Sequence, residues 1–181
     1  MAVKVLVKAE DLFQVGEDKR VELVKGEIVE MSPTGMEHGA IVVNLAMLIG
    51  GYVHANGLGR VYAGEPGVIL ERDPDTVRAP DLMFIAASRL PAQGTPAGFG
   101  DVVPDLAVEV VSPNDRWSEI EEKVDDYLAA GVRMIWVVNP KTRSVHVYRP
   151  SSDARRILES DTLQGEEVLS GFAVPAKDLF K

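Results

Sequence analysis

The sequence predicts an α/β (α+β) fold in which helices flank one mixed β-sheet. A helical pattern is followed by several short apolar strands, then by a second helical pattern and further strands, without the repeated strand–helix–strand units of a doubly wound fold. The 181 residues, 46% of them hydrophobic, can bury one core without a staple. We expect one domain over 1–181, with a β-hairpin extension at about 20–32 and a C-terminal tail at about 151–181.

The composition excludes several kinds of site. The chain has no cysteine, which rules out disulfides, thiolate nucleophiles, zinc fingers and iron–sulfur clusters. The formal net charge of −9 disfavours tight, sequence-independent binding of nucleic acid through its phosphates. Neither a signal-peptide pattern nor a run of 18 uninterrupted apolar residues is present. We therefore expect a cytoplasmic protein with no membrane segment.

Two elements are predicted before residue 60. The segment RVELVKGEIVEMS alternates around Lys25-Gly26, which indicates a β-hairpin with a tight turn. Apolar residues then recur at spacings of three and four, as at Ile41, Leu45 and Leu48. This period predicts one amphipathic helix from near Glu37 to Asn56-Gly57.

Short segments bounded by glycine and proline follow the helix. We expect strands at 60–63 and 68–70 joined by a turn, a polar turn at 73–78, and a buried strand at 82–85. Three prolines and three glycines between 88 and 104 indicate one long loop. Long loops inside compact domains often carry function, so this loop is a candidate for substrate specificity.

The second half begins with the most strand-like segment, Leu106–Val111. Ser118 and Glu121 have the spacing of a capping box, which predicts a helix from there through Ala130. Gly131 is then expected in the left-handed conformation that ends helices. Further strands are expected at 134–138, at 144–149 and, more weakly, near Ile157 and Val168.

Glu109 is the anomaly of the sequence, because it lies in the middle of a strand between Val108 and Val110. An ionised carboxylate buried in a sheet costs several kcal/mol unless it is paired or bound to a metal. The alternatives to a functional site are a salt bridge with a nearby arginine and a strand that faces solvent on one side.

Three further residues are weighed with Glu109. Asp81 follows a proline and begins a buried strand, where a turn-capping aspartate is also common. Asp105 shares strand parity with Glu109, but four strand residues span about 13 Å, too far to share a metal. Lys123 borders the apolar stripe of the second helix and could reach the sheet, although a surface pair with Glu119 is the simpler interpretation.

Two acids from neighbouring strands and a lysine form a recognised chemical set. Carboxylate oxygens suit Mg²⁺ or Mn²⁺, which bind phosphates. The metal can activate a water and offset phosphodiester charge, while an ammonium stabilises the transition state. With three histidines and no cysteine, the chain does not favour zinc, and it has none of the phosphate-loop or serine-elbow motifs.

In four segments the chain resembles the Uma-two family of bacterial restriction endonucleases, long a domain of unknown function within the PD-(D/E)XK nuclease superfamily. The segments are RVELVKGEIVEMSPTGMEHGAIV, VRAPDLMFI, PDLAVEVVSPNDR and EKVDDYLAAGVRMIWVVNPKTRSVHVYR, which together span about residues 10 to 150. The resemblance implies a restriction-endonuclease-like mixed β-sheet flanked by helices, with a divalent metal at one end of the sheet.

The resemblance assigns the two acids to Asp81 and Glu109, with the backbone carbonyl of Val110 as a further metal ligand. The superfamily lysine would stand two residues after the second acid, where this chain has Val111. In this branch the lysine is thought to have moved to the following helix, which matches Lys123. The implied catalytic set is therefore Asp81, Glu109 and Lys123.

Four more residues are candidates for supporting roles. Glu37 or His38, at the start of the long helix, would add a carboxylate or an imidazole near the metal, and Glu65 is a weaker candidate for the same role. Arg116, in the loop after the Glu109 strand, would meet a phosphate, although a solvated loop arginine is the commoner case. Tyr127 is interpreted as a core residue.

The leading functional hypothesis is a divalent-metal-dependent endonuclease that uses Mg²⁺ or Mn²⁺ and prefers DNA to RNA. A homodimer is compatible with this function, since many restriction-type nucleases pair to cut two strands. Two other classes stay open. One is a nucleic-acid-binding module that keeps the fold with weak or no cleavage, and the other is a structural or oligomerising protein whose Glu109 is only salt-bridged.

Overall fold

The computed structural model describes residues 6–15, 20–150 and 152–181. Its six-stranded mixed sheet has the strand order β10-β9-β8-β7-β6-β3, and a four-stranded sheet has the order β2-β1-β5-β4. The elements are α1 (Ala9–Val15), β1 (Val21–Val24), β2 (Glu27–Glu30), α2 (Met36–Asn56), β3 (Gly59–Ala63), β4 (Val68–Glu71), β5 (Thr76–Arg78), β6 (Leu82–Ala86), η1 (Ala87–Arg89), β7 (Leu106–Val110), α3 (Trp117–Ala129), β8 (Met134–Asn139), β9 (Ser144–Tyr148), β10 (Arg155–Leu158), β11 (Thr162–Gln164), β12 (Ala173–Pro175) and η2 (Ala176–Phe180).

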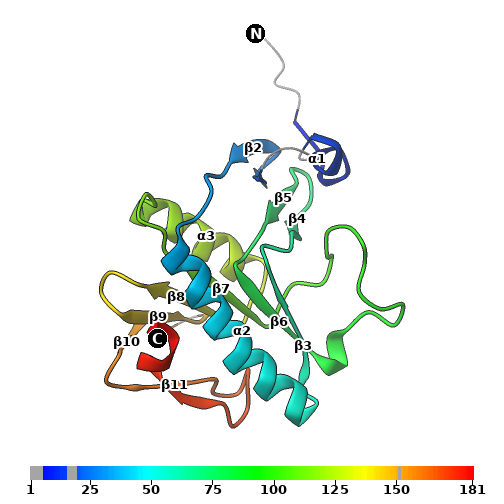
Figure 1. Cartoon of the computed structure of the whole chain (residues 1–181). Coiled ribbons are helices and arrows are strands. Elements are labelled where there is room, and N and C mark those ends of the chain that lie inside the picture. Colours follow the sequence, from blue (N-terminus) through cyan, green and yellow to red (C-terminus); the bar gives the residue numbers. More distant parts are fainter. Residues whose placement is uncertain (1–5, 16–19, 151) are drawn as a thin grey trace.

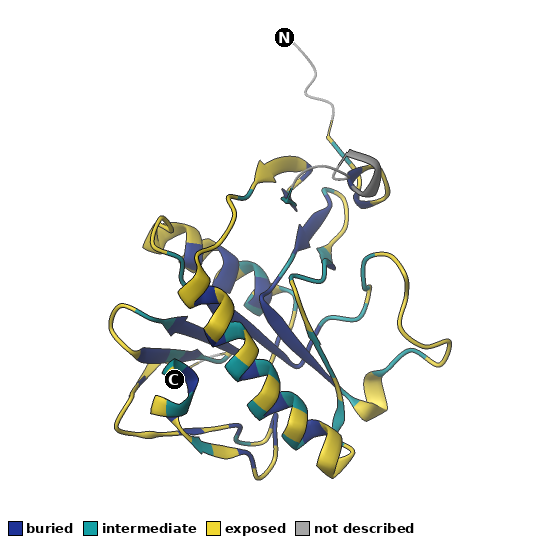
Figure 2. Cartoon of the chain, viewed as in Figure 1, coloured by how far each residue is buried: buried dark blue, intermediate teal, exposed yellow. Residues whose placement is uncertain are grey.

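The six-stranded sheet is covered on both faces (Figure 1). On one face α2 and the C-terminal elements bury the larger core, to which alternate residues of β7 such as Leu106 and Val108 contribute. On the other face α3 packs over Ala107 and neighbouring β8 residues. Figure 2 shows the central strands buried between these layers. The predicted mixed sheet flanked by helices is confirmed.

The predicted α2 is also confirmed, and Gly57 ends it in the left-handed conformation, at φ 60. Ile41, Leu45 and Ile49 form its buried face. Among the described helices, α2 is the one that is long and apolar enough to cross a membrane by length and composition. The apolar residues that recur along one face of α2 are those that pack against the sheet.

The predicted hairpin is present as β1 and β2. Its turn residues Lys25 and Gly26 both have positive φ, 49 and 78, as the tight turns of hairpins require. The hairpin is not a free extension, because Leu23 of β1 pairs with Val77 of β5. The prediction of a polar turn over 73–78 is therefore wrong at its end, where the buried β5 joins the hairpin to β4. Two pairing partners and burial outweighed the polar character of the segment.

Three other local predictions need correction. Helix α3 begins at Trp117, and the Glu119 carboxylate accepts the hydrogen bond of the Arg116 backbone N–H, so the Ser118–Glu121 capping box is wrong. Ile157 lies in β10 as predicted, but Val168 lies in the turn that separates β11 from β12. Strands β3 and β4 are present as predicted, but they belong to different sheets, whereas the sequence predicts one mixed sheet.

The conformation of Gly59, at the start of β3, gives a test of the fold. Its φ is +149, and a Cβ there would lie 2.1 Å from the backbone oxygen of Ile85. We expect Gly59→Ala to lower the free energy of unfolding by about 3 kcal/mol or more, because backbone strain adds to this clash. Urea denaturation measures the change.

Gly50 provides the matched control, since a Cβ at this position in α2 would meet nothing within 4 Å. Gly50→Ala should raise the free energy of unfolding by up to about 1 kcal/mol, through helix propensity. Equal effects of the two substitutions would contradict the close approach of β3 to β6.

Candidate active site

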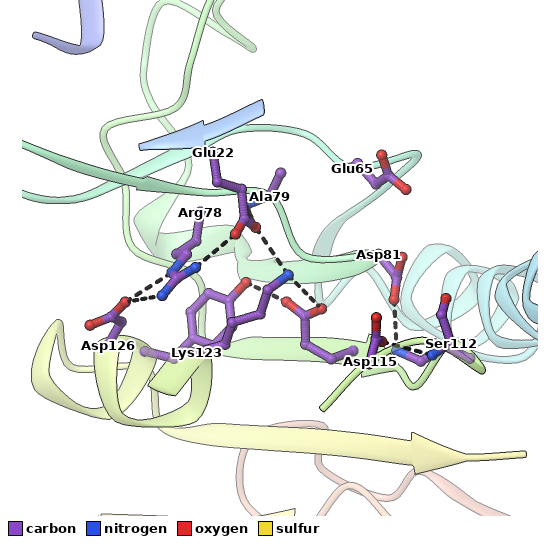
Figure 3. Close-up of polar contacts among 12 residues, drawn as sticks. Glu22, Glu65, Arg78, Ala79, Asp81, Ser112, Asp115, Lys123 and Asp126 are labelled. Atoms are coloured by element: carbon purple, nitrogen blue, oxygen red, sulfur yellow. Dashed lines mark hydrogen bonds and ion pairs between the residues drawn. The ribbon is translucent and has the colours of Figure 1, made fainter. Parts of the chain in front are cut away.

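The two predicted acids lie side by side on adjacent strands. Strands β6 and β7 are antiparallel with Leu82 opposite Val108, so the preceding Asp81 stands opposite Glu109. The Val110 backbone N–H donates a hydrogen bond to Asp81 Oδ2 at 2.6 Å. This contact holds the Asp81 carboxylate against the end of β7 (Figure 3).

Glu109 faces α3 and is 4% exposed. The Tyr127 hydroxyl donates a hydrogen bond to Glu109 Oε1 at 2.6 Å, and Lys123 Nζ lies 3.3 Å from Oε2. Both donors come from α3, at positions one turn apart. The ion pair is the salt-bridge alternative that the sequence left open, but its partner is Lys123 and not an arginine.

Burial is the largest influence on the pKa of Glu109 and raises it, and the nearby Asp81 and Glu22 carboxylates add to this effect. The Lys123 charge opposes them, and the resulting pKa of Glu109 is about 7. Burial alone would lower the pKa of Lys123, but Glu109 and Glu22 outweigh it and hold that pKa above its usual range. The lysine is therefore charged, whereas Glu109 titrates near neutral pH.

Glu22 of β1 is the site residue that the sequence analysis missed. Its Oε1 lies 3.1 Å from Lys123 Nζ, and it also accepts the Ala79 backbone N–H at 3.0 Å. Arg78 Nη1 donates to Oε2 at 2.8 Å and bonds Asp126 of α3 through its other nitrogens. Burial would raise the pKa of Glu22, but Lys123 and Arg78 lower it below the usual value.

Of the two candidates at the start of α2, the structure brings one to the acids. His38 is buried, and its Nε2 lies 3.2 Å from Asp81 Oδ2. Burial would lower the pKa of His38, but the hydrogen bond and charge of Asp81 raise it. Glu37 is exposed on the same turn, because successive helical residues point about 100° apart.

The two remaining candidates lie farther out. Glu65 pairs with Arg20, whose Nε lies 2.6 Å from Glu65 Oε2, and it is close enough to His38 to raise the pKa of that imidazole. Arg116 is exposed at the N-cap of α3. Within the described chain, Arg116 is not among the residues that line the cleft beside the acids.

That cleft has a volume of about 1140 Å³ and is open to solvent. The hairpin, the start of α2, the ends of β6 and β7 and one side of α3 form its walls, and Asp81, Glu109 and Lys123 are part of its lining. Among the described residues, nine carboxylates line it: Glu22, Glu27, Glu30, Glu65, Asp81, Glu109, Asp115, Glu119 and Glu122. The lysines and arginines of the described lining are four: Arg20, Lys25, Arg78 and Lys123.

The donor set fits a hard divalent cation. Asp81 and Glu109 supply carboxylate oxygens on adjacent strands, and Mg²⁺ binds through one or two carboxylates and keeps several waters. The buried carboxylates near Glu109 repel its negative charge and raise its pKa, and a cation bound between them would offset this repulsion. Among the described residues, no group of three or more histidine or acidic side chains is arranged to hold a metal by itself.

The fold matches that of a protein of known structure. A crystal structure of "a putative nuclease belonging to DUF820" from Anabaena variabilis ATCC 29413 superposes with a TM-score of 0.85, with 98% of each chain covered and 22% sequence identity. At that identity the likeness shows the fold alone. No protein of curated function matches the chain.

The family follows from the sequence itself. The profile of the Uma2 family, described as "Putative restriction endonuclease", matches residues 9–177. The chain belongs to this family, as the resemblance in its four segments indicated.

Tyr127, expected only in the core, has a polar role that can be tested. Tyr127→Phe removes the hydroxyl that donates to Glu109, and we expect a loss of about 1.5–3 kcal/mol in the free energy of unfolding at pH 8. That hydrogen bond lowers the pKa of Glu109, so we expect the pKa of Glu109 to rise above 7 in the variant.

The loss should depend on pH. The pKa of Glu109 is higher in the folded protein than its ordinary value of 4.5. The stability that protonation of Glu109 contributes is therefore fully present below about pH 4.5 and is lost as the pH rises through 7. In Tyr127→Phe this loss of stability continues to higher pH. The substitution should therefore lower the free energy of unfolding more at pH 8 than at pH 5, and urea denaturation at both pH values measures the difference. Tyr148→Phe, at the half-buried edge of the same core, is the control, and a loss independent of pH would contradict the assignment.

Proposed function

We propose that this protein is a divalent-metal-dependent endonuclease that hydrolyses phosphodiester bonds in DNA in preference to RNA. One observation carries the proposal: Asp81 just before β6, Glu109 of β7 and Lys123 of α3 converge on the lining of one open cleft. Family membership supports a nuclease activity. Mg²⁺ or Mn²⁺ is the cofactor that the oxygen donors favour.

Each residue has a distinct role in this proposal. Asp81 and Glu109, with the backbone carbonyl of Val110, would hold the metal, which when bound supplies an activated water and offsets phosphate charge. Asp81 is oriented by the Val110 N–H and His38, and Glu109 by the Tyr127 hydroxyl. The Lys123 ammonium stabilises negative charge that develops on the phosphoryl oxygens.

One site of this kind cuts one strand. We therefore also propose that two copies act together on duplex DNA, as a homodimer in the cytoplasm. Sedimentation of the protein with and without duplex DNA measures the assembly.

The acidic lining of the cleft favours a second candidate function. In the described part of the lining, nine carboxylates against four lysines and arginines repel a polyanion unless cations are bound. A member of the family that has weak or no cleavage, and acts as a binding or oligomeric module, would tolerate such a lining. The two candidates differ in whether the site cleaves nucleic acid when a divalent metal is present.

Calorimetric titration with Mn²⁺ tests the metal site. Asp81→Asn and Glu109→Gln should each weaken binding at least about tenfold, because each removes a charged oxygen ligand. Affinity in the wild type should rise about fivefold between pH 6 and pH 7, since the metal must displace the proton from Glu109, whose pKa is about 7. Glu122→Gln, also in the cleft lining, is the control for lost charge. Unchanged binding in both folded ligand variants would rule out this site.

Cleavage of supercoiled plasmid DNA with Mg²⁺ tests the activity. Lys123→Met should lower kcat about 10²- to 10³-fold, because a preorganised charge beside the reacting phosphate is lost. Lys141→Met, an exposed lysine of the β8–β9 turn, should leave kcat unchanged. A wild type that binds Mn²⁺ but cleaves neither DNA nor RNA would establish the second candidate function instead.

A further inference from the structure

The Lys123 ammonium is shared between two carboxylates that come from opposite sides of the site. Glu109 of β7 contributes Oε2 at 3.3 Å, and Glu22 of β1 contributes Oε1 at 3.1 Å. In Figure 3, Lys123 points into the space below Glu22, and dashed contacts run from its tip in two directions. The proposed nuclease needs only one of these carboxylates, Glu109, for the metal.

Glu22 is held firmly on its other side. Its Oε1 accepts the Ala79 N–H and its Oε2 accepts Arg78 Nη1. Arg78 also donates to Asp126, three residues after Lys123 on α3, from Nε at 2.8 Å and Nη2 at 2.6 Å. The hairpin and α3 are thus joined by two ion-pair contacts, one through Lys123 and one through Arg78.

These contacts fix the Glu22 carboxylate beside the Lys123 ammonium. Both of its oxygens already accept hydrogen bonds from Ala79, Arg78 and Lys123. A cation bound by Glu109 would repel the Lys123 ammonium and withdraw charge from the carboxylate that faces it. Buried Lys123 would then depend on Glu22 for its remaining anionic partner in the described site.

We propose that Glu22 is a positioning residue that keeps the Lys123 ammonium at the active site while Glu109 binds the metal ion. This inference rests on the proposed function, because it assumes that a metal binds to Glu109. Arg78 supports Glu22 in this role by fixing its carboxylate toward α3. The β1–β2 hairpin therefore contributes to the active site, in addition to forming one wall of the cleft.

The ammonium signal of Lys123 tests this directly. Buried, ion-paired lysine ammonium groups exchange slowly enough for a ¹H–¹⁵N resonance, which Lys123→Met would assign by its disappearance. The wild type should keep this resonance at saturating Mg²⁺. Glu22→Gln should keep it without metal, through Glu109, and lose it when Mg²⁺ is added. Glu122→Gln should behave as the wild type does.

Glu22→Asp guards against misfolding of the glutamine variant. Aspartate retains a charge for Arg78 but is one methylene shorter, so it should fold and still lose the Lys123 resonance with Mg²⁺ bound. Persistence of the resonance in both Mg²⁺-loaded variants would overturn the positioning role alone. Failure of the wild type to bind Mg²⁺ would overturn both this role and the proposed metal site.

The kinetics of plasmid cleavage give a second readout. Glu22→Gln should lower kcat at least tenfold, while KM for DNA and the affinity for Mn²⁺ change less than threefold. In a Lys123→Met background the same substitution should cause no further loss, because Glu22 acts through Lys123. A further tenfold loss in that background would show that Glu22 acts in another way.

Discussion

The buried carboxylate of Glu109 is the constraint on which the rest of the structure depends. A charge in the middle of a covered sheet has a high desolvation cost, and the raised pKa of Glu109 measures how incompletely its partners offset this cost. Those partners, Tyr127 and Lys123, both come from α3. The connection between parallel strands β7 and β8 lays α3 over β7 and so brings both partners to Glu109.

Lys123 extends this constraint beyond the central sheet. It is 8% exposed, and a buried ammonium needs more than one anionic partner when its first partner is itself only partly ionised near pH 7. Glu22 provides the second partner and Arg78 balances Glu22. Strands β1 and β5 meet through Leu23 and Val77 in the same region. The position of the hairpin over the site is thus set by electrostatics as well as by strand pairing.

The sequence predicted what depends on local pattern. The strand around Glu109, the two long helices and the turn at Lys25-Gly26 follow from periodicity and turn chemistry. Family resemblance added Asp81 and the displaced Lys123, and the structure brings both to Glu109. Their catalytic roles stay predictions.

Glu22 and β5 could not be predicted in the same way, because their environment is set by distant parts of the chain. In the sequence Glu22 occupies an ordinary polar position of an alternating hairpin, and its burial depends on Arg78 and on Lys123, 101 residues away (123 − 22). Strand β5 has three residues and follows a polar turn, so its pattern is too short to detect. Arg78, directly before Ala79-Pro80-Asp81, was the signal available in the sequence. It indicates a buried ion pair only after an acidic partner is known.

The charge balance of the site links these observations to the proposed cofactor. Lys123 and Arg78 pair with Glu22, Glu109 and Asp126, while Asp81 contacts His38. In this described cluster four carboxylates against one lysine and one arginine leave −4 + 2 = −2 before His38 is counted. A proton on Glu109, whose pKa is about 7, offsets part of this excess without metal, and the Asp81 charge raises the pKa of His38. A divalent cation would offset all of it at once and release the proton from Glu109. Nucleic acid, which the −9 chain would otherwise repel, would then meet a metal centre without excess negative charge, so metal binding is expected to precede DNA binding.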